Sequence, residues 1–240
     1  MIGIIGGNGV AATNRLCQLI EEKLTKKGAF RDFHHPEMII WQATQAPSRS
    51  MYLEGKGRSF IPDYVRIAKQ LENCGCDELC MCCNTAHYAI DELINQTGMK
   101  FINVIDEVAK VVNKKGCKKV LVMCTAGLRK FNLYERSFSK YAQNVEVRYP
   151  SDEIQKWVTN GICNAKNSHR FSSKEIDEEH PYNCFMKVCD YYRYNSDVDC
   201  IIGGCTDISN VFMPVFSDIV YIDSLDVLAN IICDKYGRKI

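Results

Sequence analysis

The sequence predicts an α/β protein with mainly parallel sheets, built as two related halves. Short apolar runs alternate with amphipathic helical patterns along the 240 residues, the order that parallel strands and crossover helices require. Two cysteines, Cys83 and Cys205, each follow an apolar run and precede small polar residues. The motifs that follow expected strands in the first half recur in the second half, each at nearly the same distance along the chain from its counterpart. We therefore expect a duplicated strand–helix unit and a pseudo-two-fold axis that brings the two cysteines to opposite sides of one cleft.

The first half of the chain contains four apolar runs that we expect to form strands: 2–5, 38–41, 78–82 and 101–105. A Gly-rich turn follows the first run and leads into a helix whose apolar residues recur at spacings of three and four: Leu16, Leu19, Ile20 and Leu24. The turn is a weak match to a dinucleotide fingerprint, because its spacing is not G-x-G-x-x-G. The helices expected in this half are 11–24, 62–73, a helix ending at 94, and 106–113.

The second half repeats the alternation. Its expected strands are 118–123, 145–149, 199–202 and 219–223. Its expected helices are one after Gly127, then 151–164, 186–194 and a closing helix to 233. The polar stretch 164–179 is predicted to be a flexible connection or the start of a helix.

Composition and charge exclude several classes of partner. The formal net charge is +1 with no basic block, so neither nucleic acid nor a membrane surface is expected to bind. No apolar run is long enough to span a bilayer, and the N-terminus lacks a signal-peptide pattern. We therefore expect a cytoplasmic protein.

The chain contains 14 cysteines, which we expect to be mostly reduced and buried, as small apolar residues are. Five of them cluster between Cys74 and Cys83. Their spacing is not that of zinc or iron–sulfur sites, and side chains alternate along a strand, so they cannot all converge. No metal site is predicted.

Cysteines at strand ends are suited to proton transfer. A thiolate there is favoured by backbone N–H groups and by the dipole of a following helix. Two opposed thiols, one ionised and one protonated, can remove a proton from one face of a carbon and return one to the other. Asn84, Thr85 and Thr206 are candidate donors to the carbanion. Arg49 lies in the polar loop 42–50 and is a candidate clamp for a carboxylate.

Simpler interpretations stay open at this point. Cys83 and Cys205 are both compatible with buried structural residues, the usual fate of cysteine, and Arg49 with a solvated surface residue. Alternatively, Cys83 and His87 form the nucleophile–base pair of a hydrolase or amidase. The hydrolase interpretation leaves the Cys205 motif unexplained.

Four motifs resemble those of the PLP-independent aspartate/glutamate racemase superfamily, and within it the aspartate racemase branch. The motifs are Ile5-Gly6-Gly7-Asn8-Gly9, Ala46-Pro47-Ser48-Arg49-Ser50, Cys83-Asn84-Thr85-Ala86-His87 and Gly204-Cys205-Thr206-Asp207. The resemblance covers nearly the whole chain. It implies two Rossmann-like domains with the active site in the cleft between them, the first domain being completed by the C-terminal segment. The expected limits are 1–105 plus 212–240 for the first domain and 106–211 for the second.

The resemblance also implies a racemase that uses no cofactor, acts on a small acidic amino acid and forms a homodimer. Cys83 and Cys205 would be the two acid/base thiols, and Arg49 would bind the side-chain carboxylate of the substrate. The residues that would hold its α-carboxylate and amino group are Asn8, Asn84, Thr85, Thr125 and Thr206.

The chain departs from the family pattern at two places. Asp207 stands where Glu is usual, and Cys163 stands at the position of a lysine that contacts the distal carboxylate. Lys166 is the candidate to take over that contact. These departures bear on the choice between aspartate and another substrate more than on racemisation.

Two other functions are compatible with the motifs. One is an isomerase or decarboxylase of dicarboxylic acids, similar to maleate isomerase, with Cys83 as a nucleophile. The other is a non-catalytic protein that binds acidic amino acids, although binding alone does not require two thiols.

Overall fold

A computed structural model describes residues 1–238 of the chain. The chain divides into two compact units: Met1–Val104 with the described part of Leu225–Ile240, and Ile105–Ser224. Each unit carries a four-stranded sheet whose neighbouring strands are all parallel. The α/β class with two parallel sheets is thereby confirmed.

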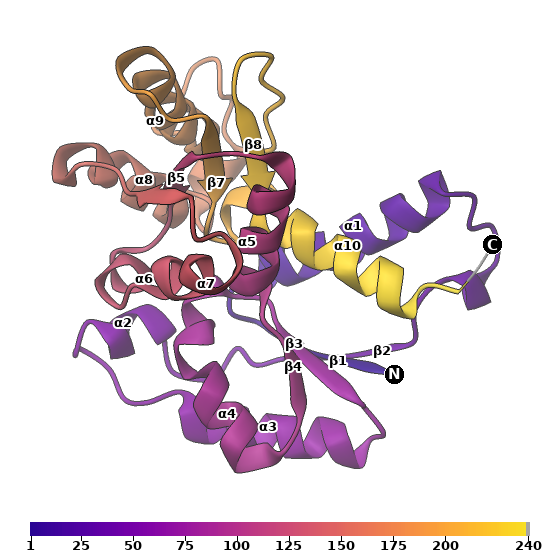
Figure 1. Ribbon diagram of the computed structural model, residues 1–240. Coiled ribbons are helices and arrows are strands. Elements are labelled where there is room, and N and C mark those ends of the chain that lie inside the picture. The colour runs from indigo at the N-terminus through magenta and orange to yellow at the C-terminus, as the bar shows by residue number, and fades with distance from the viewer. Residues whose placement is uncertain (239–240) are drawn as a thin grey trace. The chain divides into compact units, whose positions relative to one another are not determined.

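The first unit is built around the sheet β2-β1-β3-β4 (Figure 1). Its strands are β1 (Ile2–Gly6), β2 (Met38–Gln42), β3 (Glu78–Met81) and β4 (Lys100–Ile102). Its α-helices are α1 (Val10–Lys26), α2 (Arg49–Leu53), α3 (Ile61–Asn73), α4 (Ile90–Thr97) and, from Leu225 on, α10 (Ser224–Tyr236). Its short 3₁₀ helices are η1 (Asp32–His34) and η2 (Asn84–Ala89).

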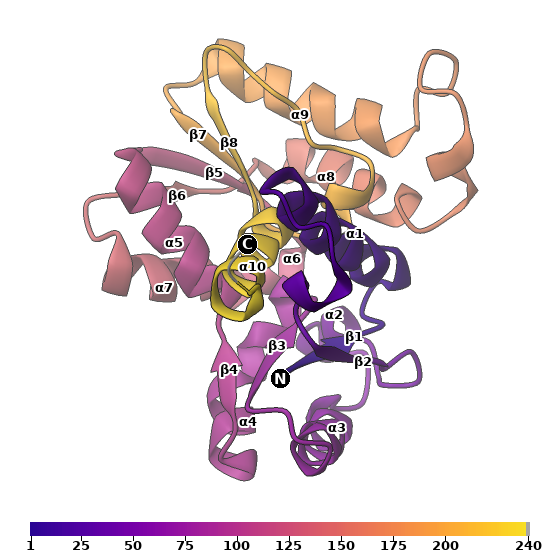
Figure 2. The same cartoon turned by 90° about the vertical axis from the view of Figure 1, so that its right-hand side faces the viewer.

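The sheet of the first unit is covered on both faces. One face packs against α3 and α4 in a cluster that includes Ile5, Met81, Ile67 and Leu93. On the other side, α1 and α10 lie next to each other in both views (Figures 1 and 2). They are joined by the Lys23–Asp226 ion pair at 2.7 Å. Because both of their faces are covered, the central strands β1 and β3 are almost entirely buried, as in other parallel sheets.

The second unit is built around the sheet β6-β5-β7-β8. Its strands are β5 (Lys119–Met123), β6 (Glu146–Arg148), β7 (Cys200–Gly203) and β8 (Val220–Asp223). Its α-helices are α5 (Val104–Lys115), α6 (Ala126–Lys130), α7 (Leu133–Tyr141), α8 (Asp152–Asn164) and α9 (Pro181–Asn195). Its 3₁₀ helices are η3 (Ser168–Phe171) and η4 (Ile208–Asn210).

Helices α8 and α9 pack against each other and against one face of the second sheet. Alternate strand residues such as Leu121, Met123 and Ile201 join this cluster with Val158 and Phe185 of the helices. The residues between them along the strands are also fully buried, which is expected when both faces of a sheet are covered.

The two sheets share one topology. In each, the first strand along the chain is central, the second joins one side of it and the third joins the other. The strand order therefore reverses between β1 and β3, and again between β5 and β7. Open α/β sheets place ligands at the carboxyl ends of the strands beside such a reversal. This internal likeness agrees with the duplication that the sequence predicts.

The chain returns to the first unit later than the predicted limit at residue 212. Residues 212–224 group with the second unit because β8 pairs with β7, with Ile202 opposite Ile222. The change occurs at Leu225, at the start of α10. Residues 239 and 240 of the predicted first domain lie outside the described residues.

Two helices begin where the sequence did not place them. Helix α9 begins at Pro181, before the expected residue 186, because Pro181 suits a first turn and His180 caps the helix by accepting from the Tyr182 N–H at 3.1 Å. Arg49 opens the short helix α2 and does not lie in a loop. Ser48 caps α2 by accepting from the Met51 N–H at 3.3 Å.

Within residues 1–238, no helix is both long and apolar enough to cross a membrane.

Candidate active site

In each unit, candidate residues lie at the carboxyl end of the sheet, beside the reversal of strand order. In the first unit, Asn8 follows β1 and Cys83 follows β3. In the second unit, Thr125 follows β5 and Cys205 follows β7. Each unit thus presents one candidate thiol at the place where its own topology favours a ligand.

The residue before each thiol forms the same backbone hydrogen bond in the two units. The N–H of Cys82 donates to the carbonyl of Ile5 at 3.1 Å, and the N–H of Gly204 donates to the carbonyl of Met123 at 2.8 Å. Both bonds connect the end of the third strand of a unit to the end of its first. Cys83 and Cys205 are both half-buried, so each is a partly exposed residue that follows a fixed backbone.

Asn8 is held in place by its own side chain. Its Oδ1 accepts a hydrogen bond from the hydroxyl of Tyr64, and its Nδ2 donates to the carbonyl of Ile5 at 3.4 Å. The preceding Gly7 has φ +75°, and a Cβ there would lie 2.6 Å from the backbone nitrogen of Ala43. Only glycine fits this turn, which explains why Asn8 is reached through a Gly-Gly pair.

Arg49 is anchored by backbone carbonyls. Its guanidinium donates to the carbonyl of Pro47 at 3.1 Å and to the carbonyl of Asn8 at 3.2 Å. Its Nε is buried and has no hydrogen-bond partner, and no ion pair involves Arg49 within residues 1–238. The guanidinium is therefore oriented but not neutralised, which suits it to bind an anion.

Tyr64 connects three candidate residues that the sequence could only name separately. Burial raises the pKa of Tyr64; the Arg49 guanidinium opposes that rise, and the Cys83 thiol adds to it. Tyr64 is fully buried and also donates to Asn8. Sequence reasoning missed it because a tyrosine on the apolar face of α3 has the pattern of an ordinary core residue.

Cys83 precedes a 3₁₀ helix of six residues, and α4 begins only at Ile90. The sequence predicted that a regular helix would start at the cysteine, so the helix-dipole contribution at Cys83 is smaller than expected. Asn84 and Thr85 are buried in the first turn of η2. The motif therefore turns its polar side chains inward directly after the thiol.

His87 stabilises the first motif through hydrogen bonds at both of its ring nitrogens. Nδ1 lies 2.9 Å from the carbonyl oxygen of Cys83, and Nε2 accepts from the N–H of Val104 at 3.2 Å. A carbonyl can only accept, so Nδ1 carries the proton and the imidazole is the neutral tautomer. This geometry favours a positioning role for His87 over that of the base in a Cys–His pair.

Asp207 joins two candidate residues in the second unit. Its Oδ2 accepts from the thiol of Cys205 at 3.9 Å and lies 2.8 Å from Nζ of Lys166. The Asp207 side chain is buried whereas that of Lys166 is half exposed, and Oδ1 of Asp207 is buried with no hydrogen-bond partner. Cys163, by contrast, is exposed. Thus Lys166, and not Cys163, lies beside the Cys205 motif.

The surroundings of Gly204, the residue directly before Cys205, are tightly packed. A Cβ on Gly204 would lie 2.8 Å from Val122 and 3.1 Å from the Tyr134 hydroxyl, so a side chain does not fit there. Burial raises the pKa of Tyr134 well above its usual value, and the charges of Cys124, Asp223 and Cys205 add to the rise. The sequence did not single out Tyr134 or Asp223, because both reach the motif only through the tertiary fold.

The predicted residues thus form one group in each unit. Asn8, Arg49 and Cys83 are linked through Tyr64, with Asn84 and Thr85 directly after the thiol. Cys205 and Lys166 are linked through Asp207. Thr206 lies between Cys205 and Asp207 in the sequence and is buried, and Thr125 precedes α6. In the described part of the chain, no group of three or more His, Cys, Asp or Glu residues could hold a metal ion.

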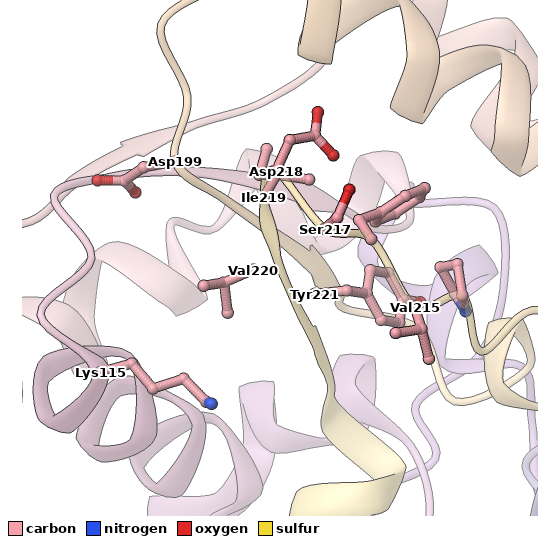
Figure 3. A pocket seen from close by; sticks show the side chains of 10 residues that line it. Lys115, Asp199, Val215, Ser217, Asp218, Ile219, Val220 and Tyr221 are labelled. Carbon is pink, nitrogen blue, oxygen red and sulfur yellow. The ribbon is translucent and has the colours of Figure 1, made fainter.

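The cavity drawn in Figure 3 is a separate feature of the second unit. It has a volume of about 450 Å³ and lies between Lys115, Asp199 and the segment 214–221. None of the predicted site residues lines it.

Comparison with known proteins gives one consistent result. The family model described as Asp/Glu/Hydantoin racemase matches residues 2–232. The chain is 24% identical over 239 residues to the broad specificity amino-acid racemase RacX of Bacillus subtilis (strain 168), covering 98% of each. Among solved structures, an aspartate racemase from Picrophilus torridus is similar with a TM-score of 0.81 and 26% identity, over 100% of this chain and 95% of that one. A glutamate racemase from Francisella tularensis subsp. tularensis SCHU S4, in complex with D-glutamate, shares the fold with a TM-score of 0.62 and 16% identity, over 97% and 79%.

Proposed function

Because the chain belongs to the Asp/Glu/Hydantoin racemase family, and is an isomerase of that family, we propose that it interconverts L- and D-aspartate, or glutamate, by proton transfer between two thiols. Cys83 and Cys205 act as the two acid/base groups, and each serves one enantiomer. The reaction needs no cofactor in this proposal. We include in it the expected homodimer and cytoplasmic location.

The proton balance of the reaction is simple. The thiolate of one cysteine takes the proton from Cα, and the thiol of the other delivers a proton to the opposite face. The amino acid gains no atom, and the protein ends with the ionised and protonated sulfurs exchanged. The next molecule of the opposite enantiomer restores the first state. Fixed donors stabilise the carbanion between the two transfers, a role that we assign to Asn84, Thr85 and Thr206.

Substrate binding follows from the anchored cations. Arg49 is oriented by two carbonyls and has no anionic partner in residues 1–238, so we assign it to the side-chain carboxylate. Asn8 and Thr125 contribute to the α-carboxylate and amino group. Lys166 adds positive charge beside Cys205 and assists with the distal carboxylate.

One observation carries the proposal. In each unit, the third strand along the chain is followed by a half-buried cysteine, and the residue before that cysteine donates the same backbone hydrogen bond to the first strand. A nucleophile would need only one such thiol, whereas a two-base racemase needs two of equal standing. The duplicated placement therefore supports racemisation over the isomerase, decarboxylase and binding alternatives.

The decisive experiment is incubation of the protein with L-aspartate in D₂O, followed by chiral separation and mass spectrometry. At early times, the D-aspartate formed is expected to carry one deuterium at Cα while recovered L-aspartate keeps its proton, because different sulfurs act on the two faces. Cys83→Ser and Cys205→Ser are each expected to abolish interconversion, and Cys74→Ser, at an exposed position, to leave it unchanged. Failure to convert any acidic amino acid, or a stable adduct on Cys83, would overturn the proposal.

A racemase with a wider substrate range is the second candidate. The relative from Bacillus subtilis is named a broad specificity amino-acid racemase, and the charge of Lys166 is balanced here by Asp207 at 2.8 Å. Conversion of neutral amino acids at rates similar to those of aspartate would favour this candidate, and the chiral separation can be repeated with a panel of both kinds.

A further inference from the structure

A second pair of cysteines lies away from the candidate active site. Cys117 comes just before β5, and Cys200 is the first residue of β7. Both side chains are buried, and the two thiols are hydrogen bonded to each other. They lie at the beginning of the strands, the opposite end from Cys205, so the proposed function does not use them.

Backbone contacts hold the two thiols together. The carboxylate of Asp199 accepts from the N–H of Lys118 at 2.7 Å and from the N–H of Lys119 at 3.1 Å. The N–H of Asp199 donates in turn to the carbonyl of Lys119 at 3.0 Å. Thus each cysteine is adjacent in sequence to a residue of this double contact. The strand register, with Val120 opposite Cys200, continues the same alignment into the sheet.

The charges around the pair favour a thiolate at Cys117. Its flanking sequence is Lys114-Lys115-Gly116-Cys117-Lys118-Lys119. The hydrogen bond from Cys200 lowers the pKa of Cys117 to about 7, and Lys115 adds to this effect, while burial and Asp199 oppose it. The same hydrogen bond, together with burial, raises the pKa of Cys200. The pair therefore combines a nucleophilic sulfur with a protonated partner.

The cavity of Figure 3 lies beside this region. Lys115 and Asp199 line it, and both act electrostatically on Cys117. In Figure 3 these two residues lie at one end of the cavity, on either side of Val220. A space of about 450 Å³ admits small polar molecules to the surface next to the pair.

We propose that Cys117 and Cys200 form a redox-active pair that hydrogen peroxide oxidises to a disulfide within the second unit. The Cys117 thiolate attacks one peroxide oxygen, the O–O bond breaks, and one water leaves after protonation. The thiol of Cys200 then attacks the resulting sulfenic sulfur, and a second water leaves. Two thiols and one peroxide thus give one disulfide and two waters, with two electrons passing from sulfur to oxygen.

The disulfide would join the beginnings of β5 and β7. β7 is the strand that ends directly before the Cys205 motif, so the cross-link fixes the base of the strand that carries this thiol. Because the two thiols are hydrogen bonded to each other, their sulfurs start within reach of one another.

The test uses the intact, fully reduced protein. It is treated with a small excess of hydrogen peroxide, free thiols are blocked with an alkylating agent, and the protein is digested without reductant for mass spectrometry. We expect a cross-linked peptide pair containing Cys117 and Cys200, lighter by two hydrogen atoms than the reduced pair and split by dithiothreitol. The cross-link should form at least ten times faster in the native protein than in urea, where the two thiols are not held together.

Variants provide the matched controls. Cys117→Ser and Cys200→Ser should remove this cross-link, and Cys74→Ser should retain it, since Cys74 is exposed on the first unit. If a serine variant does not fold, the comparison of native and urea-treated protein still decides. The proposal is overturned if peroxide oxidises exposed cysteines while Cys117 and Cys200 stay alkylatable after unfolding, or if the cross-link forms equally fast in urea.

Discussion

The ammonium group of Lys166 lies 2.8 Å from Oδ2 of Asp207, and the same oxygen accepts from the thiol of Cys205 at 3.9 Å. One buried carboxylate therefore faces a half-exposed cation and a candidate catalytic sulfur together. Its second oxygen has no hydrogen-bond partner. The aspartate side chain is shorter than that of the glutamate usual at this position in the family, and these contacts show how Asp207 is accommodated there.

Replacing Asp207 by Asn should reduce racemisation strongly while preserving the shape of the site. The amide cannot pair ionically with Lys166 and accepts less strongly from Cys205, so the thiol is less well positioned. We expect kcat/KM to fall about 100-fold, the typical effect of misplacing a reacting group. Because the enantiomers have equal free energies in water, the fall must be equal in both directions. Asp207→Glu keeps the charge and should retain most activity; equal losses in both variants would contradict this role.

Replacing Lys166 by Met should separate acidic from neutral substrates. If Lys166 contacts the distal carboxylate, its loss should raise KM for aspartate about 10-fold or more, the usual effect of losing one charged hydrogen bond. KM for alanine, where it is a substrate, should hardly change. Lys156→Met is the matched control, an exposed lysine on α8, the helix that ends just before Lys166. Initial rates by chiral chromatography measure both; a parallel rise for aspartate and alanine would refute the assignment.

Replacing Tyr64 by Phe removes the hydroxyl that donates to Asn8. The buried Oδ1 of Asn8 then loses this donor, and we expect the free energy of unfolding to fall by about 1–3 kcal/mol. KM should also rise, since the Asn8 carbonyl orients Arg49 at 3.2 Å. Urea unfolding and substrate titration measure the two effects. Tyr52→Phe, at a half-buried ring in the same unit, is the control and should change neither; a fully stable Tyr64→Phe protein would show that the hydrogen bond contributes little.

The segment 167–180 should respond to pH through His169. The hydrogen bond to Asp177 raises the pKa of His169, while Ser172 and then His169 lower the pKa of Asp177 to about 2. A histidine whose pKa is raised by folding adds stability below its unfolded pKa, roughly 6.5, and this stability is lost as pH rises through the folded pKa. The urea midpoint of the wild type should thus drop more between pH 6 and pH 9 than that of His169→Gln. His35→Gln should behave like the wild type, and an identical drop in His169→Gln would contradict the linkage.

The sequence predicts local features of this molecule better than distant ones. The strands before Cys83 and Cys205 are found where the apolar runs place them, because buried parallel strands are continuously apolar. Which sheet the last strand joins is a different matter. The run 219–223 is compatible with either sheet, and only its pairing with β7 assigns residues 212–224 to the second unit.

The same distinction holds for the candidate site. The thiols, Arg49 and Asn8 can be named from motifs because each occurs in a short characteristic sequence. Tyr64 and Tyr134 cannot, since their helices bring them to the motifs only after packing. Lys166 could be named as a candidate, but its contact with Asp207 joins two segments far apart in the sequence, which no local pattern records.

The return of the chain to the first unit at Leu225 has a consequence for biosynthesis. The Ile105–Ser224 unit is continuous in sequence, so all of it has been synthesised before α10 is made. The first unit begins earlier but must wait, because α1 contacts α10 through the Lys23–Asp226 pair and through the Cys233 thiol, which donates to the Ile20 carbonyl at 3.6 Å. Until α10 has been synthesised, the side of the first unit that α10 covers stays exposed. The unit whose synthesis begins first is therefore completed last.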